Sequence, residues 1–291
     1  MKKLYKSIAI VAVLLICSGV FAQAKKTTSV NSNDKSLLWE ISGNGLSKSS
    51  FLYGTIHMIC GNDYFLSEKT KKAFNATESL FLEIDLSDPN ELVFMQKAAM
   101  SAEPLSKKLT AKQLSDLDII LRQITGMTIQ QVDNYSMLTV LSLISMKSFG
   151  CENLKFYEME FIGLAKESKK SIGGLETMEA QIHFLNKAYS DDEMIAMLQE
   201  TNGEETEKMV QNYINENLPE LYKEITTPKL MNENSKKWML EVRNENWAVK
   251  MPDVMKEKST FFAVGAAHLL GKEGLINLLR KASYSVKPLL N

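Results

Sequence analysis

Two of the three histidines in this chain follow the same short pattern of residues. His57 ends the run Tyr-Gly-Thr-Ile-His, and His268 ends the run Val-Gly-Ala-Ala-His, so each imidazole comes three residues after a glycine. An apolar run precedes each pattern, which is typical of a buried strand that ends at the histidine. Imidazole is an acid or base near neutral pH and a common metal ligand. The repeat predicts one site that uses both side chains; the alternative is two unrelated histidines bonded to backbone at strand ends.

Glu83 lies in a third apolar run, Leu-Phe-Leu-Glu-Ile-Asp, over residues 80–85. An unpaired carboxylate in such a strand costs several kcal/mol, so it needs a cation, a cluster of donors or water. A metal ion shared with the two histidines would meet that need, and we predict that Glu83 is a metal ligand and a catalytic carboxylate. The alternative for Glu83, and more strongly for Asp85, is a strand face exposed to solvent.

A further group of polar residues could support this site. Arg243 and Asn244 begin the run Arg-Asn-x-x-Trp in a long helical stretch, and Glu176 follows a Gly-Gly pair. An arginine could neutralise a carboxylate or hold an oxyanion. Taken alone, Arg243 and Asn244 fit a solvated helix surface equally well, and Glu176 fits a helix start.

The strands that would carry these residues lie near the two ends of the sequence. Strands are predicted over residues 37–41, 51–56, 80–85, 260–264 and 284–286. Residues 90–170 read as almost wholly helical, and helices continue to about residue 258. Neither end alone can bury both faces of a sheet, so we expect both ends to pair in one mixed sheet. The prediction is a single α/β (α+β) domain over 37–291, with βαβ-type halves and an all-helical insertion at about 90–170.

The N-terminus has the layout of a secretory signal peptide. Lysines precede an apolar core over residues 8–16, and small residues follow, with cleavage expected after Ala22 or Ala24. Residues 25–36 form a polar linker, and no later segment has the ~18 consecutive apolar residues that span a bilayer. We therefore expect an exported protein, periplasmic or secreted, rather than one with an uncleaved N-terminal anchor.

The charge and the cysteines limit the partners and the chemistry. Lys and Arg total 34 against 35 for Asp and Glu, and this balance gives no support to nucleic-acid binding. Cys60 and Cys151 remain after removal of the signal peptide. Export permits a disulfide, but two separate buried thiols fit the sequence equally well.

These motifs together resemble the TraB/GumN family, which is related to the Tiki metalloproteases and to erythromycin-esterase-like and ChaN-like folds. Each motif is short, and it is their order along residues 37–290 that is specific. The matching stretches are Leu38–Ile41, Tyr53–His57, Leu82–Asp85, Gly174–Thr177 with Gln181, Arg243–Trp247, Val264–Leu269 and Gly274–Val286.

The resemblance implies a sheet of two related halves, with one Gly-x-x-His from each half at a shared cleft. It also implies a divalent-metal-dependent peptidase in which His57, His268 and Glu83 hold manganese, cobalt or zinc, with Arg243 and Asn244 in support. The metal would lower the pKa of a water that attacks an amide carbonyl, and Arg243 would offset charge on the oxyanion. The expected substrate is an extracytoplasmic peptide or protein.

Two other functions fit the same residues. A protein that binds and sequesters a peptide pheromone would need the cleft but no activated water. A metal-free, esterase-like hydrolase would use a histidine and Glu83 as acid and base.

Overall fold

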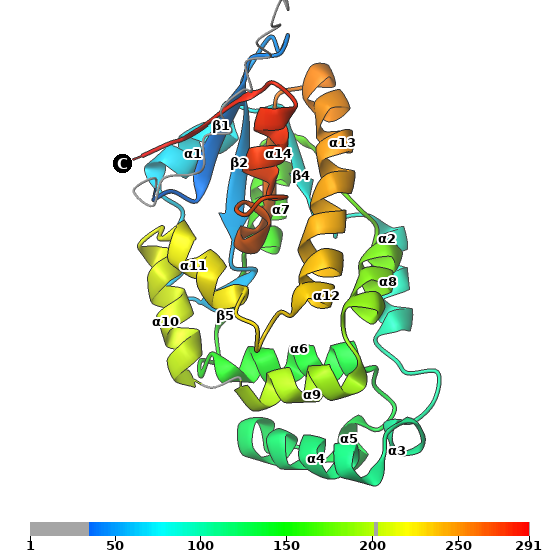
Figure 1. Ribbon diagram of the computed structural model, residues 1–291. Coiled ribbons are helices and arrows are strands. Elements are labelled where there is room, and N and C mark those ends of the chain that lie inside the picture. The colour runs from blue at the N-terminus through cyan, green and yellow to red at the C-terminus, as the bar shows by residue number, and fades with distance from the viewer. Residues whose placement is uncertain (1–34, 201–202, 291) are drawn as a thin grey trace, which may run out of the picture.

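The computed structural model describes residues 35–200 and 203–290 (Figure 1). The predicted signal peptide, with both expected cleavage positions, and residues 25–34 of the linker lie outside these residues. No helix in the described part of the chain is long and apolar enough to cross a membrane.

A mixed six-stranded sheet forms the centre of the fold. Its strands are β1 (Leu38–Ser42), β2 (Ser50–Thr55), β4 (Ser79–Leu82), β6 (Ser171–Gly174), β7 (Thr260–Gly265) and β8 (Ser285–Pro288). The spatial order is β6-β4-β7-β2-β1-β8, in which β6, β4, β7 and β2 are parallel and β1 is antiparallel to both neighbours. The prediction of one mixed sheet from both ends of the chain is confirmed, because β7 lies between β2 and β4.

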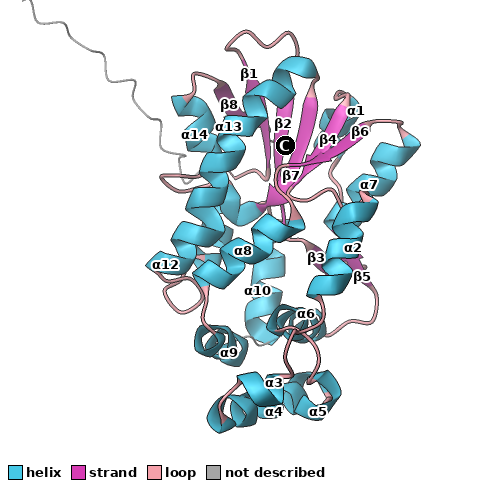
Figure 2. Ribbon diagram, turned by 90° about the vertical axis from the view of Figure 1, so that its right-hand side faces the viewer, coloured by secondary structure: helices cyan, strands magenta, loops and turns pink. Residues whose placement is uncertain are grey.

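Helices cover both faces of this sheet. Figure 2 shows α13 (Val242–Glu257) and α14 (Leu275–Lys281) on one side and α1 (Glu68–Asn75) and α7 (Tyr157–Glu167) on the other. Phe261 of β7 packs against Phe74 of α1 and Phe161 of α7, with ring centroids 5.4 and 5.2 Å apart. Because helices cover both faces of the sheet, the side chains on both faces of β7 are buried, which explains its continuous apolar run.

Residues with known capping preferences stand at several helix ends. The Ser67 and Thr177 side chains accept backbone N–H bonds at the start of α1 and of α8 (Met178–Ala188). Gly126, with φ of +73°, ends α4 (Ala111–Thr125) in the left-handed region that favours glycine. Further helical elements near the sheet and the site are α2 (Pro89–Ala98), α10 (Gly203–Ile214), α11 (Leu218–Ile225), α12 (Glu233–Lys236), the π-helix Lys237–Glu241 and the 3₁₀ turn Ala266–His268.

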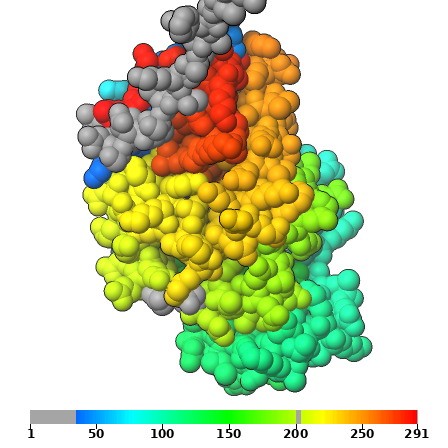
Figure 3. Space-filling view, viewed as in Figure 1, coloured from blue at the N-terminus to red at the C-terminus, as the bar shows by residue number. Residues whose placement is uncertain are grey.

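A second group of helices has an apolar cluster of its own. Its members are α3 (Leu105–Lys108), α4 (Ala111–Thr125), α5 (Ile129–Val132), α6 (Met137–Ser148) and α9 (Asp191–Glu200). Their buried side chains, among them Leu117, Leu121 and Ile144, form a cluster separate from the one around the sheet. Figure 3 shows α3–α6, coloured teal to green, at the lower end of the molecule.

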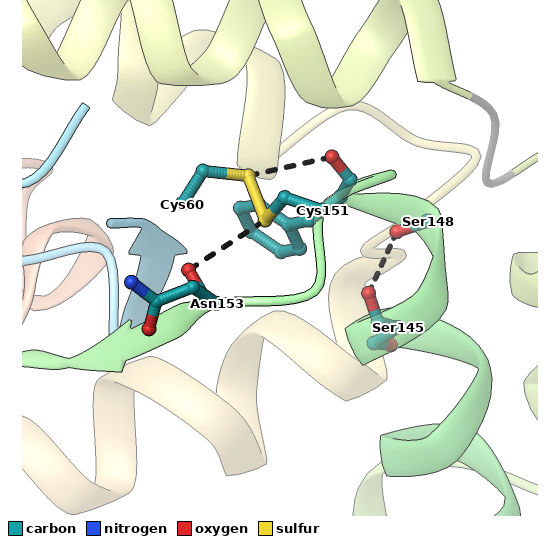
Figure 4. Close-up of a disulfide and its surroundings, with 6 residues drawn as sticks. Cys60, Ser145, Ser148, Cys151 and Asn153 are labelled. Carbon is teal, nitrogen blue, oxygen red and sulfur yellow. Dashed lines mark hydrogen bonds between the residues drawn. A yellow bond between two sulfur atoms is a disulfide. The ribbon is translucent and has the colours of Figure 1, made fainter. Parts of the chain in front are cut away.

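A short two-stranded ribbon was not expected from the sequence. β3 (Met58–Cys60) pairs antiparallel with β5 (Leu154–Phe156). β5 lies within residues 90–170, which the sequence predicted to be almost wholly helical. Strands of three residues are too short for an alternating pattern to reveal them. A disulfide joins Cys60 to Cys151 beside this ribbon (Figure 4), so of the two alternatives for these cysteines the bridge is the one formed.

Leu121→Ala tests whether the second apolar cluster stabilises the fold. Leu121 is fully buried in α4, and removing its side chain leaves a cavity, so we expect the free energy of unfolding to fall by about 2–5 kcal/mol. Ile119 lies in the same helix but is 51% exposed, and Ile119→Ala should change the free energy by no more than about 0.5 kcal/mol. Urea denaturation of both variants measures the difference, and equal effects would contradict the assignment.

Candidate functional site

The three predicted metal ligands follow the ends of three neighbouring strands. His57 comes two residues after β2, Glu83 directly after β4, and His268 at the end of the 3₁₀ turn that follows β7. These strands are parallel, so their carboxyl ends meet at one edge of the sheet, where ligand sites of open α/β sheets collect.

The side chains of these residues converge on one carboxylate oxygen. Glu83 Oε1 lies 3.9 Å from His57 Nε2 and 3.8 Å from His268 Nε2. The side chains of Glu83 and His268 are 9% and 5% exposed, whereas that of His57 is 54% exposed. The site therefore has a buried side and a side open to solvent, and His57 lies on the open side.

The glycine of each Gly-x-x-His pattern permits close packing. A Cβ on Gly265 would lie 2.9 Å from His57 Nε2, and one on Gly54 would lie 3.0 Å from Ala266 Cα. Neither glycine has a positive φ; that conformation occurs at His57 itself, with φ of +60°. These two glycines therefore serve a close approach of neighbouring atoms rather than a turn with positive φ.

Asn244 orients the ring of His268. The Asn244 amide donates to the carbonyls of His268 and Glu273, at 3.3 and 2.9 Å, so its Oδ1 faces His268 Nδ1 at 2.6 Å. Nδ1 must therefore carry the proton, and the lone pair on Nε2 accepts from Arg243 Nη1 at 3.1 Å. Burial and the Arg243 charge lower the pKa of His268 to about 3, so the ring is neutral.

His57 has a carboxylate partner that the sequence did not reveal. Its Nδ1 lies 2.7 Å from Glu158 Oε1, which also accepts from Thr55 Oγ1 at 3.0 Å. Burial lowers the pKa of His57, but the Glu158 charge and hydrogen bond outweigh it and raise the pKa to about 9. Because the His57 side chain is 54% exposed, solvent screens part of this attraction. Glu158 lies in the first turn of α7, where an acidic residue is common, so no sequence signal distinguished it.

Arg243 holds the buried half of the site together. Its side chain is 3% exposed, and each of its five N–H groups has an acceptor. The acceptors are Glu83 Oε2 at 2.5 Å, Glu176 Oε1 at 2.7 Å from Nη2 and 3.0 Å from Nε, Met239 O at 3.0 Å and His268 Nε2 at 3.1 Å. None of these N–H groups is left to bind an oxyanion.

Two carboxylates share this one guanidinium. Burial raises the pKa of Glu83, but the charge of Arg243, with smaller effects of His57 and of the Gly265 N–H bond, outweighs it and holds the pKa well below its usual range. Burial raises the pKa of Glu176 against the opposing effect of Arg243. Gln181 donates to both carboxylates at 3.1 Å, and Trp247 Nε1 donates to Glu176 at 3.2 Å. Glu176 therefore belongs to the site cluster rather than to the surface.

The cluster carries an excess of negative charge. Glu83 and Glu176 bond the guanidinium of Arg243, and Glu158 bonds His57. The three carboxylates exceed the guanidinium by two negative charges when both histidines are neutral, and by one when His57 is protonated. Uncompensated charge at a site of this burial is costly, so the cluster attracts cations. The third histidine, His183, is exposed on α8 and takes no part.

The nitrogen–oxygen distances between the histidines and Glu83 are slightly longer than those between the ligands of a metal ion. No group of three or more His, Cys, Asp or Glu residues in 35–200 and 203–290 is arranged so that it could hold a metal ion. Ligands at ~2.0–2.2 Å from a tetrahedral ion lie roughly 3.4 Å apart. The two Nε2 atoms are 3.9 and 3.8 Å from Glu83 Oε1, a few tenths of an ångström beyond that spacing.

Sequence comparison assigns the chain to a family. A sequence model of the TraB/PrgY/gumN family matches residues 37–288. The chain belongs to this family. The match covers every element from β1 to β8, including both Gly-x-x-His strands and the helices between them. The family resemblance inferred from the ordered motifs is confirmed.

Curated relatives of this TraB/PrgY/gumN protein are metalloproteases. It is 25% identical to metalloprotease TIKI1 of Xenopus tropicalis, over 90% of this chain and 62% of the relative. It is also 25% identical to metalloprotease TIKI2 of Xenopus tropicalis, over 82% of this chain and 57% of the relative. It is 22% identical to the metalloprotease TIKI homolog of Nematostella vectensis, over 88% of this chain and 67% of that protein. The chain thus spans about 60% of the length of the two Xenopus relatives. No solved structure matches it significantly.

Gly265→Ala tests the close approach at the site. The added Cβ would lie 2.9 Å from His57 Nε2 and 3.3 Å from Glu83 Oε1, so we expect a loss of about 1–3 kcal/mol in the free energy of unfolding. Gly163 lies in α7 with no atom within 4 Å of an added Cβ. Gly163→Ala should therefore stabilise the protein by about 0.5–1 kcal/mol. The same sign for both variants in urea denaturation would refute the steric argument.

The neutral state of buried His268 predicts a loss of stability in acid. The pKa of His268 is about 3 in the folded chain and near 6.5 when unfolded, so between these values only the unfolded chain takes up this proton. In the chelator-treated protein, the free energy of unfolding should fall with decreasing pH, by up to about 1.4 kcal/mol per pH unit more than in His268→Gln. Denaturation curves between about pH 6.5 and pH 4 measure this slope, and parallel curves would show that His268 is not the titrating group.

Proposed function

We propose that this protein is a divalent-metal-dependent hydrolase that cleaves peptide bonds at the cluster of His57, Glu83 and His268. The observation that carries the proposal is the convergence of the two Nε2 atoms on Glu83 Oε1, at 3.9 and 3.8 Å. Similarity to the TIKI metalloproteases supports the same reaction class.

The donor set fits a divalent ion. Two imidazole nitrogens and a carboxylate oxygen suit zinc, manganese or cobalt, and the two excess negative charges match the charge of such an ion. Glu158 and Asn244 lie at the Nδ1 atoms, as outer partners of ligand histidines commonly do. His268 would hold such an ion through Nε2, in place of its present bond from Arg243 Nη1. A divalent ion bound there would supply Lewis-acid chemistry, polarising a carbonyl group and lowering the pKa of water.

The surrounding residues have distinct roles in this proposal. Arg243 and Asn244 orient Glu83 and His268, and Glu176 balances the Arg243 charge. Four of the five Arg243 N–H groups bond Glu83, Glu176 and Met239 and do not depend on His268, so we propose this positioning role for Arg243 in place of the oxyanion role expected from the sequence. His57, on the open side, lies where a peptide would enter from solvent.

We further propose that the protein acts outside the cytoplasm on a peptide or protein. The proposal rests on the signal-peptide layout of residues 1–24 and on the disulfide between Cys60 and Cys151. The division into a signal peptide, a linker over 25–36 and a domain over 37–291 belongs to the same proposal.

Metal removal and replacement of the histidines test the function together. We expect the purified mature chain to cleave members of a defined peptide library with added Mn²⁺, Co²⁺ or Zn²⁺, and to lose that cleavage in EDTA. His57→Ala and His268→Ala should each lower the cleavage rate by at least about 100-fold, because each removes a proposed ligand. His183→Ala is the matched control and should cleave at the wild-type rate. Mass spectrometry of the cleavage products measures the rate for the wild type and the three variants.

One contact favours a second candidate, the metal-free hydrolase. Arg243 Nη1 donates to the Nε2 lone pair of His268. Once His57 has lost its proton, the His57–Glu158 pair has the arrangement of a general base with its orienting carboxylate. In that mechanism cleavage would persist in EDTA and would be lost in His57→Ala. Binding of peptides without any cleavage would instead favour the sequestering protein.

A further inference from the structure

The positions of His57 and Glu158 are tied together by the β3–β5 ribbon. β3 begins directly after His57, and β5 ends two residues before Glu158. Met58 pairs with Phe156, and the Tyr157 N–H donates to the His57 carbonyl at 2.8 Å. The two side chains therefore meet because the two strands are in register.

This ribbon is too short to be stable by itself. Each strand has three residues, and even longer isolated strand pairs are marginal in water. At its far end the Gly61 N–H donates to Asn153 O at 2.7 Å, and the disulfide joins Cys60 to Cys151 (Figure 4). Because these cysteines are 91 residues apart in sequence, the disulfide removes much of the freedom that the two strands would have to separate.

The backbone of His57 also needs support from its surroundings. Its φ of +60° is unfavourable for a residue with a Cβ and costs of order 1 kcal/mol or more. The bonds at this residue are one from the His57 N–H to Thr55 Oγ1 at 3.4 Å, one from the Tyr157 N–H to the His57 carbonyl at 2.8 Å, and the contact of the ring with Glu158. Displacement of Glu158 would leave the ring of this half-exposed residue free to turn.

Glu158 determines which ring nitrogen of neutral His57 carries the proton. An ionised carboxylate can only accept, so Nδ1 must be the donor in the 2.7 Å contact. The lone pair of neutral His57 then lies on Nε2, the atom that faces Glu83. An exposed imidazole without this partner has no such restraint.

We propose that Glu158 is the positioning residue for His57, and that the Cys60–Cys151 disulfide, acting through the β3–β5 ribbon, holds Glu158 in place. Reduction by a dithiol breaks the S–S bond and gives two thiols, while the reductant loses two electrons and two protons and closes to its own disulfide. The proton of His57 is then no longer fixed at Nδ1. The site is therefore responsive to the redox state of its surroundings, and the consequence for metal binding rests on the function proposed above.

Nitrogen-15 NMR of the histidine rings tests the positioning step without any metal. The chain has three histidines, so a ¹⁵N-histidine-labelled, chelator-treated sample gives few signals. At alkaline pH, above the raised pKa of His57, we expect the Nδ1–H form in the wild type and a shift toward Nε2–H in Glu158→Ala. Glu158→Gln should retain Nδ1–H, because its amide oxygen can still accept.

Glu160 provides the matched control for this measurement. It lies in the same turn of α7 and pairs with Lys155 at 2.8 Å, so Glu160→Ala should leave the His57 signals unchanged. Identical His57 signals in the wild type and Glu158→Ala would overturn the positioning role.

The disulfide is tested by the Cys60→Ser/Cys151→Ser variant and by dithiol treatment of the wild type. Both should move His57 toward the Glu158→Ala spectrum, while His268, held by Asn244, keeps its Nδ1–H signal and reports that the site is folded. Dithiol should cause no further change in Glu158→Ala. An unchanged His57 signal in the reduced wild type would overturn the role of the disulfide, including where the serine variant does not fold.

Calorimetry with Co²⁺ separates this inference from the proposed function. Glu158→Ala should bind Co²⁺ about 10–100-fold more weakly than the wild type, as expected for loss of an outer partner of a ligand histidine. A wild-type chain that binds no Co²⁺ contradicts the metal-dependent function, while the NMR result still decides the role of Glu158.

Discussion

The buried guanidinium of Arg243 is the constraint on which the site depends. A charge at 3% exposure is tolerated only when it is paired and fully hydrogen-bonded, and removing one partner of such a pair typically destabilises a protein by about 3–5 kcal/mol. Its acceptors come from the end of β4, the segment after β6, the π-helix and the turn after β7. Four parts of the chain must therefore reach their final places before this charge is satisfied. The preceding π-helix, Lys237–Glu241, supplies one of the acceptors, in keeping with the frequent occurrence of such turns at functional sites.

The two histidines are held by unlike surroundings, although their sequence patterns are the same. His268 is buried against Trp247, with ring centroids 4.4 Å apart, and both of its nitrogens are bonded within the cluster. His57 is half exposed and depends on a carboxylate at the end of a three-residue ribbon. The site thus combines a rigid, neutral imidazole with one whose orientation depends on a separate structural element. Similar motifs at two strand ends do not imply equivalent chemistry.

The sequence predicted the strands that position the site better than the hydrogen bonds within it. Apolar runs predicted five of the six strands of the central sheet, all but β6, and the paired Gly-x-x-His patterns indicated the edge where the site residues meet. Glu83 was expected to need a cation, a cluster of donors or water, and the chain itself supplies the cation Arg243 and the donors Gln181 and Gly265 N–H. Glu158 could not be distinguished because acidic residues are common in the first turn of helices, and its neighbour in space is 101 residues away in sequence. Local patterns determine elements, whereas pairing over such separations is decided by tertiary packing.

The place of β7 in the sheet has a consequence for how the protein is made. β7 is contributed by residues 260–265, yet it lies between β2 and β4 and pairs with both. During synthesis, β2 and β4 leave the ribosome long before the strand that joins them, so neither the sheet nor the cluster around Arg243 can assemble on a growing chain. A chain interrupted anywhere before residue 260 has one histidine of the pair and no arrangement in which to use it. Because β7 is the central strand, the site can form only after His268 has been synthesised.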